Sequence, residues 1–151
     1  MNPPSWSARK PAVDPLIRRQ AWFRYQLRRF LGFSERAARA SGLTPQQHQL
    51  LLGVAGYTGR GWATISELAE FLQERHNAVV GLVERSARRG LVRKEPGLTD
   101  RRFVRVLLTD KGLKILEKLT RVHREELARA EGRLLTFAKA RPGTIEESPG
   151  A

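Results

Sequence analysis

The chain of 151 residues contains no cysteine, which excludes disulfide bonds, thiolate metal sites and sensing by thiol oxidation. Long apolar runs are also missing, because the longest, Leu50 to Ala55, falls far short of the roughly 20 residues that span a bilayer. The N-terminal sequence MNPPSWSARKP lacks the apolar stretch of a secretory signal. We therefore expect a cytoplasmic protein without a membrane partner.

Residues suited to catalysis or metal binding form no grouped pattern either. The three histidines, His48, His76 and His123, are far apart along the chain. His123 and Glu126 together would supply half of a zinc site at most, on a helix that the sequence predicts to be exposed. His48 is expected to be hydrogen-bonded and partly buried. No nucleophile, base and orienting group stand in a convincing arrangement, so we expect no enzymatic activity, no cofactor and no metal.

Positive charge is what the chain has in excess. The 28 lysines and arginines outnumber the 15 acidic residues and give a net charge of +13, which attracts polyanions and makes nucleic acid the leading partner. Residues 75–111 hold ten basic and four acidic side chains, and residues 1–42 hold nine and two. Residues 43–74 hold one basic and three acidic side chains. The basic residues within residues 1–42 are either phosphate contacts or the solvated face of a helix.

Helical spacing and caps divide the chain into elements. A long helix is predicted from Pro15, with Asp14 as its cap, to about residue 41. A second begins at Thr44-Pro45 and is broken within residues 56–61. Thr64 and Glu67 have the spacing of a capping box that opens a short third helix, and after a turn at 73–75 a fourth helix ends before Gly90.

Two strands and one more helix complete the prediction. Residues 91–94 and 103–108 are apolar or β-branched enough for strands, with Pro96 and Gly97 marking a hairpin turn between them. Thr109 caps a last long helix. A short helix, a turn, a second helix and a β-ribbon form a winged helix-turn-helix, whose second helix enters the major groove of DNA. The expected fold is therefore mainly α (α+β).

Within the predicted DNA-reading helix, each residue has more than one interpretation. Asn77 either pairs with an adenine edge or caps the helix, and Val80 either contacts a thymine methyl or lies in the core. Gly81 permits either close approach of DNA or close packing. The candidate DNA contacts in the two helices are Thr64, Ser66, Arg75, His76, Asn77, Val80, Gly81 and Arg85. Capping alone also explains Thr64.

The hairpin tip carries Asp100, Arg101 and Arg102. A wing beside the reading helix brings its tip to the minor groove, whose negative potential attracts arginine. Asp100 is expected to orient one arginine through a charge-assisted hydrogen bond. These three residues therefore join the candidate DNA contacts, with a solvated turn as the alternative for Arg102.

The segments LTPQQHQLLLGV, SELAEFLQERHNAVVGLVERSARRGLVRK and DRRFVRVLLTDKG resemble the MarR-type winged-helix regulators over about residues 16–138. The third segment matches the family's D-x-R wing followed by a strand and L-T-x-K-G. The resemblance implies a homodimer that binds a pseudo-palindromic operator, usually as a repressor released by a small molecule. It also implies that Arg102 is the wing arginine and Asp100 its partner.

The expected domain organisation follows from these elements. Residues 1–14 and 139–151 are expected to be flexible, and residues 15–138 to form one domain with a DNA-binding core at 44–112 and dimerisation helices at 15–42 and 113–138. The dimer contacts expected on those helices are Leu16, Phe23, Leu27, Leu127 and Leu134. Candidate effector contacts are Trp22, Phe33, His48, Tyr57 and Trp62, although aromatic residues at such positions are usually core.

Two other functions fit the same composition. A nucleoid- or ribosome-associated protein would use the positive charge to bind nucleic acid without choosing a sequence. A winged domain can instead serve as a protein-protein scaffold, which the net charge of +6 over residues 75–111 argues against.

Overall fold

The computed structural model describes residues 13–139, so most of the two terminal segments expected to be flexible lies outside the described residues. The chain is mainly helical with one small antiparallel sheet, as the sequence predicts. Its helices are α1 (Pro15–Ala40), α2 (Pro45–Leu52), the π-helical turn η1 (Gly53–Tyr57), α3 (Ile65–Leu72), α4 (His76–Arg88) and α5 (Asp110–Lys139). Its strands are β1 (Trp62–Thr64), β2 (Val92–Pro96) and β3 (Val104–Leu108).

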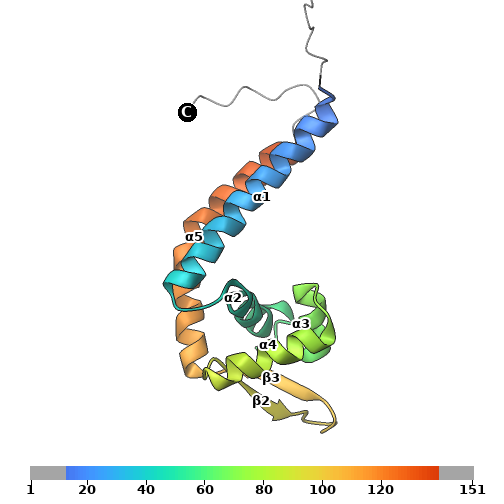
Figure 1. Cartoon of the computed structure of the whole chain (residues 1–151), viewed down its shortest axis with the longest axis vertical. Coiled ribbons are helices and arrows are strands. Elements are labelled where there is room, and N and C mark those ends of the chain that lie inside the picture. The colour runs from blue at the N-terminus through green and yellow to red at the C-terminus, as the bar shows by residue number, and fades with distance from the viewer. Residues whose placement is uncertain (1–12, 140–151) are drawn as a thin grey trace, which may run out of the picture.

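The elements form two regions (Figure 1). Helices α1 and α5 run side by side as a rod, and α2, α3, α4 and the sheet gather at one end of it as a winged unit. The β2–β3 hairpin lies at the far end of the molecule from the beginning of α1. The winged helix-turn-helix with long N- and C-terminal helices is thereby confirmed.

Side-chain caps fix where three of the helices begin. Asp14 Oδ1 accepts a hydrogen bond of 2.8 Å from the backbone N–H of Leu16. The predicted box at α3 is confirmed, since Thr64 Oγ1 accepts from the Glu67 N–H and Glu67 Oε2 accepts from the Thr64 N–H. Thr44 and Gln47 form a second box at α2. Each box satisfies two backbone donors that the helix itself leaves unpaired.

The second helix continues beyond Leu52 as the π-helical turn η1 and ends at Tyr57, within the break that the sequence predicts at residues 56–61. Gly53, at the start of this turn, is buried against α3, and a Cβ there would lie 2.7 Å from Cδ1 of Phe71. The glycine therefore allows the Phe71 ring to pack directly on the backbone of the widened turn. A π-helical turn of this kind is rare and has no sequence signal of its own.

The sheet has the order β1-β3-β2, and β1 is a strand that sequence reasoning missed. Its three residues pair antiparallel with β3, with Trp62 opposite Leu107, and are too short to show alternation. The hairpin strands also begin and end slightly differently from the prediction. Leu91 belongs to the end of α4 rather than to β2, because its N–H donates to Ser86 O while Gly90 adopts a φ of +70°.

The motif Thr109-Asp110-Lys111-Gly112 attaches α5 to the end of α4. Thr109 Oγ1 lies 2.5 Å from Gly90 O, to which it donates, and it accepts from the Gly112 N–H at 3.0 Å. Lys111 Nζ donates to Arg89 O at 2.9 Å. A Cβ on Gly112 would lie 2.0 Å from the backbone oxygen of Leu91, so only glycine fits this contact without a shift.

Candidate nucleic-acid interface

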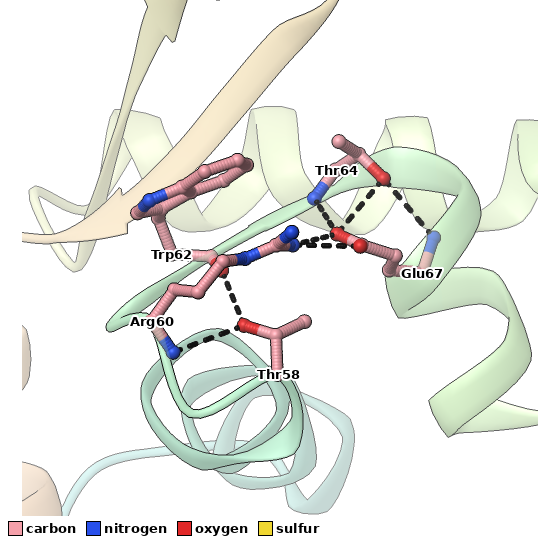
Figure 2. A network of polar contacts seen from close by, with 5 residues as sticks. All are labelled: Thr58, Arg60, Trp62, Thr64 and Glu67. Carbon is pink, nitrogen blue, oxygen red and sulfur yellow. Dashed lines mark hydrogen bonds and ion pairs between the residues drawn. The ribbon is translucent and has the colours of Figure 1, made fainter.

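A network of polar contacts fixes the approach to α3 (Figure 2). The Arg60 guanidinium carbon lies 3.9 Å from the centre of a Trp62 ring, and its Nη2 lies 2.6 and 2.7 Å from the two Glu67 carboxylate oxygens. Burial alone would raise the pKa of Glu67, but hydrogen bonds from Thr64 and Arg60 hold the pKa below its usual value. Thr58 Oγ1 completes the network by donating a hydrogen bond to Trp62 O at 2.8 Å.

This network determines which of the two polar residues predicted at α3 remains open to solvent. The Thr64 hydroxyl is engaged with Glu67 on both its donor and acceptor sides. Ser66 is exposed on the first turn of α3. Arg60, which is not among the predicted site residues, connects the loop, the strand and the helix through its contacts with Trp62 and Glu67.

Helix α4 presents its predicted reading residues outward. Val79, Leu82, Val83 and Ser86 face the core, whereas Arg75, His76, Asn77 and Arg85 are exposed. Two of the alternatives left by the sequence are wrong. Arg75, not Asn77, occupies the cap position, which places Asn77 inside the helix, and Val80 is 37% exposed rather than in the core.

The glycine in the middle of α4 has no packing role among the described residues. A Cβ at Gly81 would meet the flexible end of the Arg85 side chain, whose Nη1 lies 3.1 Å away, and no other atom within 4 Å. Because glycine costs about 1 kcal/mol relative to alanine inside a helix, its presence here is not explained by the fold of the chain itself.

At the hairpin tip, Asp100 holds Arg102 through both carboxylate oxygens. Arg102 Nη2 donates to Oδ2 at 2.8 Å, and the Arg102 backbone N–H donates to Oδ1 at 3.0 Å. The side-chain and backbone hydrogen bonds from Arg102 lower the pKa of Asp100, so the carboxyl stays charged. The Arg102 side chain is nevertheless 89% exposed. The guanidinium is therefore oriented but not covered.

The turn that carries this pair depends on Gly97. Its N–H donates to Phe103 O at 2.8 Å, and a Cβ on Gly97 would lie 2.2 Å from the backbone oxygen of Asp100. Any larger residue would force the tip to change shape. Sequence reasoning used Gly97 only as a mark of a turn, whereas it also sets the position of Asp100.

Several bases counted in residues 75–111 are already bonded within the protein. Arg105, whose side chain is 13% exposed, donates to Glu95 at 2.9 Å and to Pro96 O at 3.1 Å. Arg89 donates to Gln47 Oε1 and Gly42 O, and Lys94 pairs with Glu84. Within residues 13–139, the bases of this segment without an ion pair or hydrogen bond to another side chain or backbone include Arg75, Arg85, Arg88 and Arg101. The outward-facing positive charge of residues 75–111 is thus concentrated on α4 and the hairpin tip.

The five candidate effector residues do not come together in one pocket. Trp22 lies beside Tyr25 on the exposed side of α1, Tyr57 packs against Phe71, and Trp62 lies under Arg60. Only His48 among the five lines the hollow of about 200 Å³ between α1, α2, α3 and α4. Its other lining residues include Leu31, Ser34, Gln49 and Leu82.

Two of the histidines that are far apart in sequence meet in the structure. The rings of His48 on α2 and His123 on α5 lie 5.0 Å apart, and Phe33 approaches His123 edge-on at 5.3 Å. Both histidines are buried, so the His123 side chain faces the interior although most of its helix is exposed. Burial, and then the charge of His123, lower the pKa of His48 to about 4.

Hydrogen bonding in this pair also differs from the prediction. His123 Nδ1 lies 2.7 Å from Leu119 O and donates to it, which leaves its Nε2 buried without a partner. His48 Nδ1 is likewise buried without a hydrogen bond, so the expectation of a satisfied His48 was wrong for that atom. Within the described residues, no cluster of three metal-ligating side chains contains either histidine.

The residues predicted as dimer contacts lie along the rod. Leu16, Phe23 and Leu127 are exposed, and Leu27 and Leu134 are half-buried. Within residues 13–139, no helix is both long and apolar enough to cross a bilayer.

Residues 41–102 match the model of the MarR family. AbsC, a MarR family transcriptional regulator from Streptomyces coelicolor, is 24% identical, with a TM-score of 0.63 over 76% of this chain and 79% of that protein. A mutant MarR from E. coli complexed with operator DNA is 18% identical, with a TM-score of 0.62 over 83% and 96%. A mutant of S. aureus MepR bound to an oligodeoxyribonucleotide is 20% identical, with a TM-score of 0.59 over 85% and 84%. No match is found among curated proteins.

Proposed function

We propose that this chain is a DNA-binding transcriptional regulator of the MarR type rather than an enzyme, and that it acts as a homodimer on a pseudo-palindromic operator, because residues 41–102 match the MarR family model. The observation that carries the proposal is the pairing of an outward-facing α4 with an oriented, exposed Arg102 at the hairpin tip. An arginine in this position suits a narrow minor groove beside the major groove that holds α4.

In the proposed complex, the beginning of α4 reads base edges. Asn77 offers a bidentate contact to adenine, His76 reaches a neighbouring base or phosphate, and Val80 offers an apolar surface to a thymine methyl. Gly81 leaves room for the DNA backbone, which accounts for a glycine that the fold does not require. Arg75 and Arg85 contact phosphates.

The flanking contacts position the helix rather than read sequence. Ser66, exposed at the start of α3, donates to a phosphate, while Thr64 acts through its cap. Arg101 contributes charge at the hairpin tip, and Arg102 enters the minor groove with its orientation set by Asp100. The similarity to MarR in complex with operator DNA supports this placement of the two elements.

We propose that the rod forms the dimer. Exposed Leu16, Phe23 and Leu127 lie far from the winged unit and give a second copy an apolar surface to cover. A twofold arrangement would present two reading helices to successive major grooves about one helical turn apart. In this arrangement, the rod helices hold the two copies together, and the core at residues 44–112 binds DNA.

We further propose that the protein is a cytoplasmic repressor released by a small molecule. The hollow beside His48 touches both the rod helix α1 and the reading helix α4, so an occupant would bias their relative placement.

The function is tested by selecting bound duplexes from a random pool at fixed salt and then measuring affinity by fluorescence anisotropy. The proposal expects an enriched inverted repeat with half-sites about one turn apart. Arg102→Ala should weaken binding to selected and scrambled duplexes alike and reduce the salt slope by about 1. Arg24→Ala, which removes the same charge from the rod, is the matched control. Absence of any enriched motif would favour a non-specific basic protein instead.

A further inference from the structure

One face of α1 carries a row of exposed cationic and aromatic side chains, at Arg18, Trp22, Tyr25, Arg29 and Arg36. Their spacings of four, three, four and seven residues place them above one another along the helix. The rings of Trp22 and Tyr25 are 5.3 Å apart, and the Arg29 guanidinium carbon lies 5.9 Å from the centre of the Tyr25 ring. We call these five residues the α1 row.

The α1 row points away from the rest of the rod. The buried residues of α1, Gln26, Ser34 and Ala38, lie on the side of the helix that packs within the fold. At 100° per residue, Leu16 lies about 160° from the centre of the row, so the proposed dimer surface and the row occupy different sides of the helix. A second copy seated on Leu16 would therefore leave the row open to solvent.

The charge on this helix is almost all of one sign. Residues 15–40 contain seven arginines and one acidic residue, Glu35, which pairs with Arg39 outside the row. Within the described part of the chain, Arg18 and Arg36 take part in no ion pair. A surface with several arginines outside ion pairs and two exposed aromatic rings suits an anionic partner that also offers flat apolar faces.

We propose that the α1 row binds single-stranded nucleic acid, with bases stacked on Trp22 and Tyr25 and phosphates held by Arg18, Arg29 and Arg36. Single strands expose both base faces and phosphates, whereas the bases of a duplex are stacked on one another. The row is about 27 Å long, which suits a strand of at least about four nucleotides. An anionic membrane is the less suitable partner, because arginines interrupt the row where a membrane-binding helix has a continuous apolar face.

The α1 row is separate from the proposed duplex interface. Figure 1 shows α1 along the rod, with the hairpin of the winged unit at the other end of the molecule. A single chain can therefore hold a duplex through α4 and the hairpin while the row holds a single strand. This inference does not depend on the operator proposal, and the two fail in different experiments.

The test measures binding of the full chain to fluorescein-labelled single-stranded DNA and RNA 20-mers of mixed sequence by anisotropy. A Trp22→Ala/Tyr25→Ala variant should bind at least tenfold more weakly, since base stacking on an aromatic ring contributes about 1–3 kcal/mol per base. Removing Arg18, Arg29 and Arg36 together should lower the salt slope by about 2, at roughly 0.7 per phosphate contact.

Two matched controls separate this site from general charge. Arg24→Ala removes an arginine from another side of α1, and Arg102→Ala disables the wing; both should keep single-strand affinity within twofold. In a Trp6→Phe/Trp62→Phe background, the fluorescence of Trp22 should be quenched by the strand but not by a duplex of equal length. Circular dichroism of each variant checks that the helices remain intact.

The proposal is overturned if Arg24→Ala lowers single-strand affinity as much as Arg29→Ala does, because binding would then follow charge alone. It is also overturned if the wild-type chain binds vesicles containing one-third phosphatidylserine but no single strand, or if Trp22 fluorescence does not change at saturating strand. If Arg102→Ala loses duplex binding but keeps single-strand binding, the result supports the α1 row as a separate site and concerns only the role of the wing.

Discussion

Leu50 and Leu68 in the winged unit are completely buried, whereas Ile17 and Leu135 on the long helices are both 59% exposed. The winged unit surrounds its apolar side chains with α2, α3, α4 and the sheet, and α5 adds Leu116 and Leu119 to the same core. The far part of the rod consists of two helices, which are too few to enclose an apolar layer between them. Among the described residues, the winged unit therefore encloses its own apolar side chains, whereas the rod leaves several of its apolar side chains exposed.

The largest effect is expected when a core leucine is removed from the winged unit. Leu50→Ala deletes a fully buried side chain and should lower the free energy of unfolding by about 2–5 kcal/mol. Ile17→Ala, made on the rod, should cost less than about 0.5 kcal/mol when the chain is dilute. Urea denaturation at two protein concentrations checks both. A cost of Ile17→Ala that did not grow with concentration would argue against a second copy covering the rod.

A charge placed on the rod should have the next largest effect, on association rather than folding. Leu127→Asp puts a carboxylate into the proposed dimer surface twice, once from each copy, and should weaken dimerisation by about 3 kcal/mol or more. Analytical ultracentrifugation measures the shift in the monomer-dimer equilibrium. Leu98→Asp, at an exposed position in the hairpin, is the matched control and should leave the equilibrium unchanged.

Where the two regions meet, stability should depend on pH through His48. Its pKa is about 4 in the folded chain and about 6.5 when unfolded, so the unfolded state binds more protons between those values. Stability is therefore complete above pH 6.5, falls as pH decreases, and should be lower by about 2 kcal/mol at pH 5. Denaturant titrations from pH 7.5 to 5 check this.

A His48→Gln variant should lose most of that dependence, whatever its own stability. His76→Asn removes an exposed histidine and keeps the buried pair, so its profile should follow that of the parent chain. A flat profile in the parent would show that burial of His48, together with the charge of His123, does not keep His48 neutral in the folded chain.

The sequence predicted the winged unit well because its signals are local. The capping box of Thr64 and Glu67, the left-handed Gly90 and the Asp100–Arg102 pair each involve residues within a few positions of one another. Such contacts can be inferred from spacing alone. The network of Arg60 was missed because its meaning depends on Trp62 lying in a strand too short to recognise.

The errors concern contacts between distant segments. His48 and His123 are 75 residues apart and meet only because α5 folds back across α2. Spacing along each helix gave no sign that the two rings meet, so neither histidine was predicted to be the partner of the other. The candidate effector residues were chosen as aromatic side chains without knowledge of which ones share a cavity, and the structure distributes them over separate sites.

The smallest expected effect compares one helix cap in each region. Thr64→Ala removes the cap of α3, which is held at both ends by the surrounding fold, and should cost about 1 kcal/mol. Asp14→Ala removes the cap of α1 at the free end of the rod, where the first turn can fray without disturbing other contacts, and should cost less than about 0.5 kcal/mol. Thermal denaturation monitored by circular dichroism compares the two variants. If Asp14→Ala cost as much as Thr64→Ala, the end of the rod would be held by a partner as firmly as α3 is held by its own chain, and the contrast between the two regions would apply only to the isolated protomer.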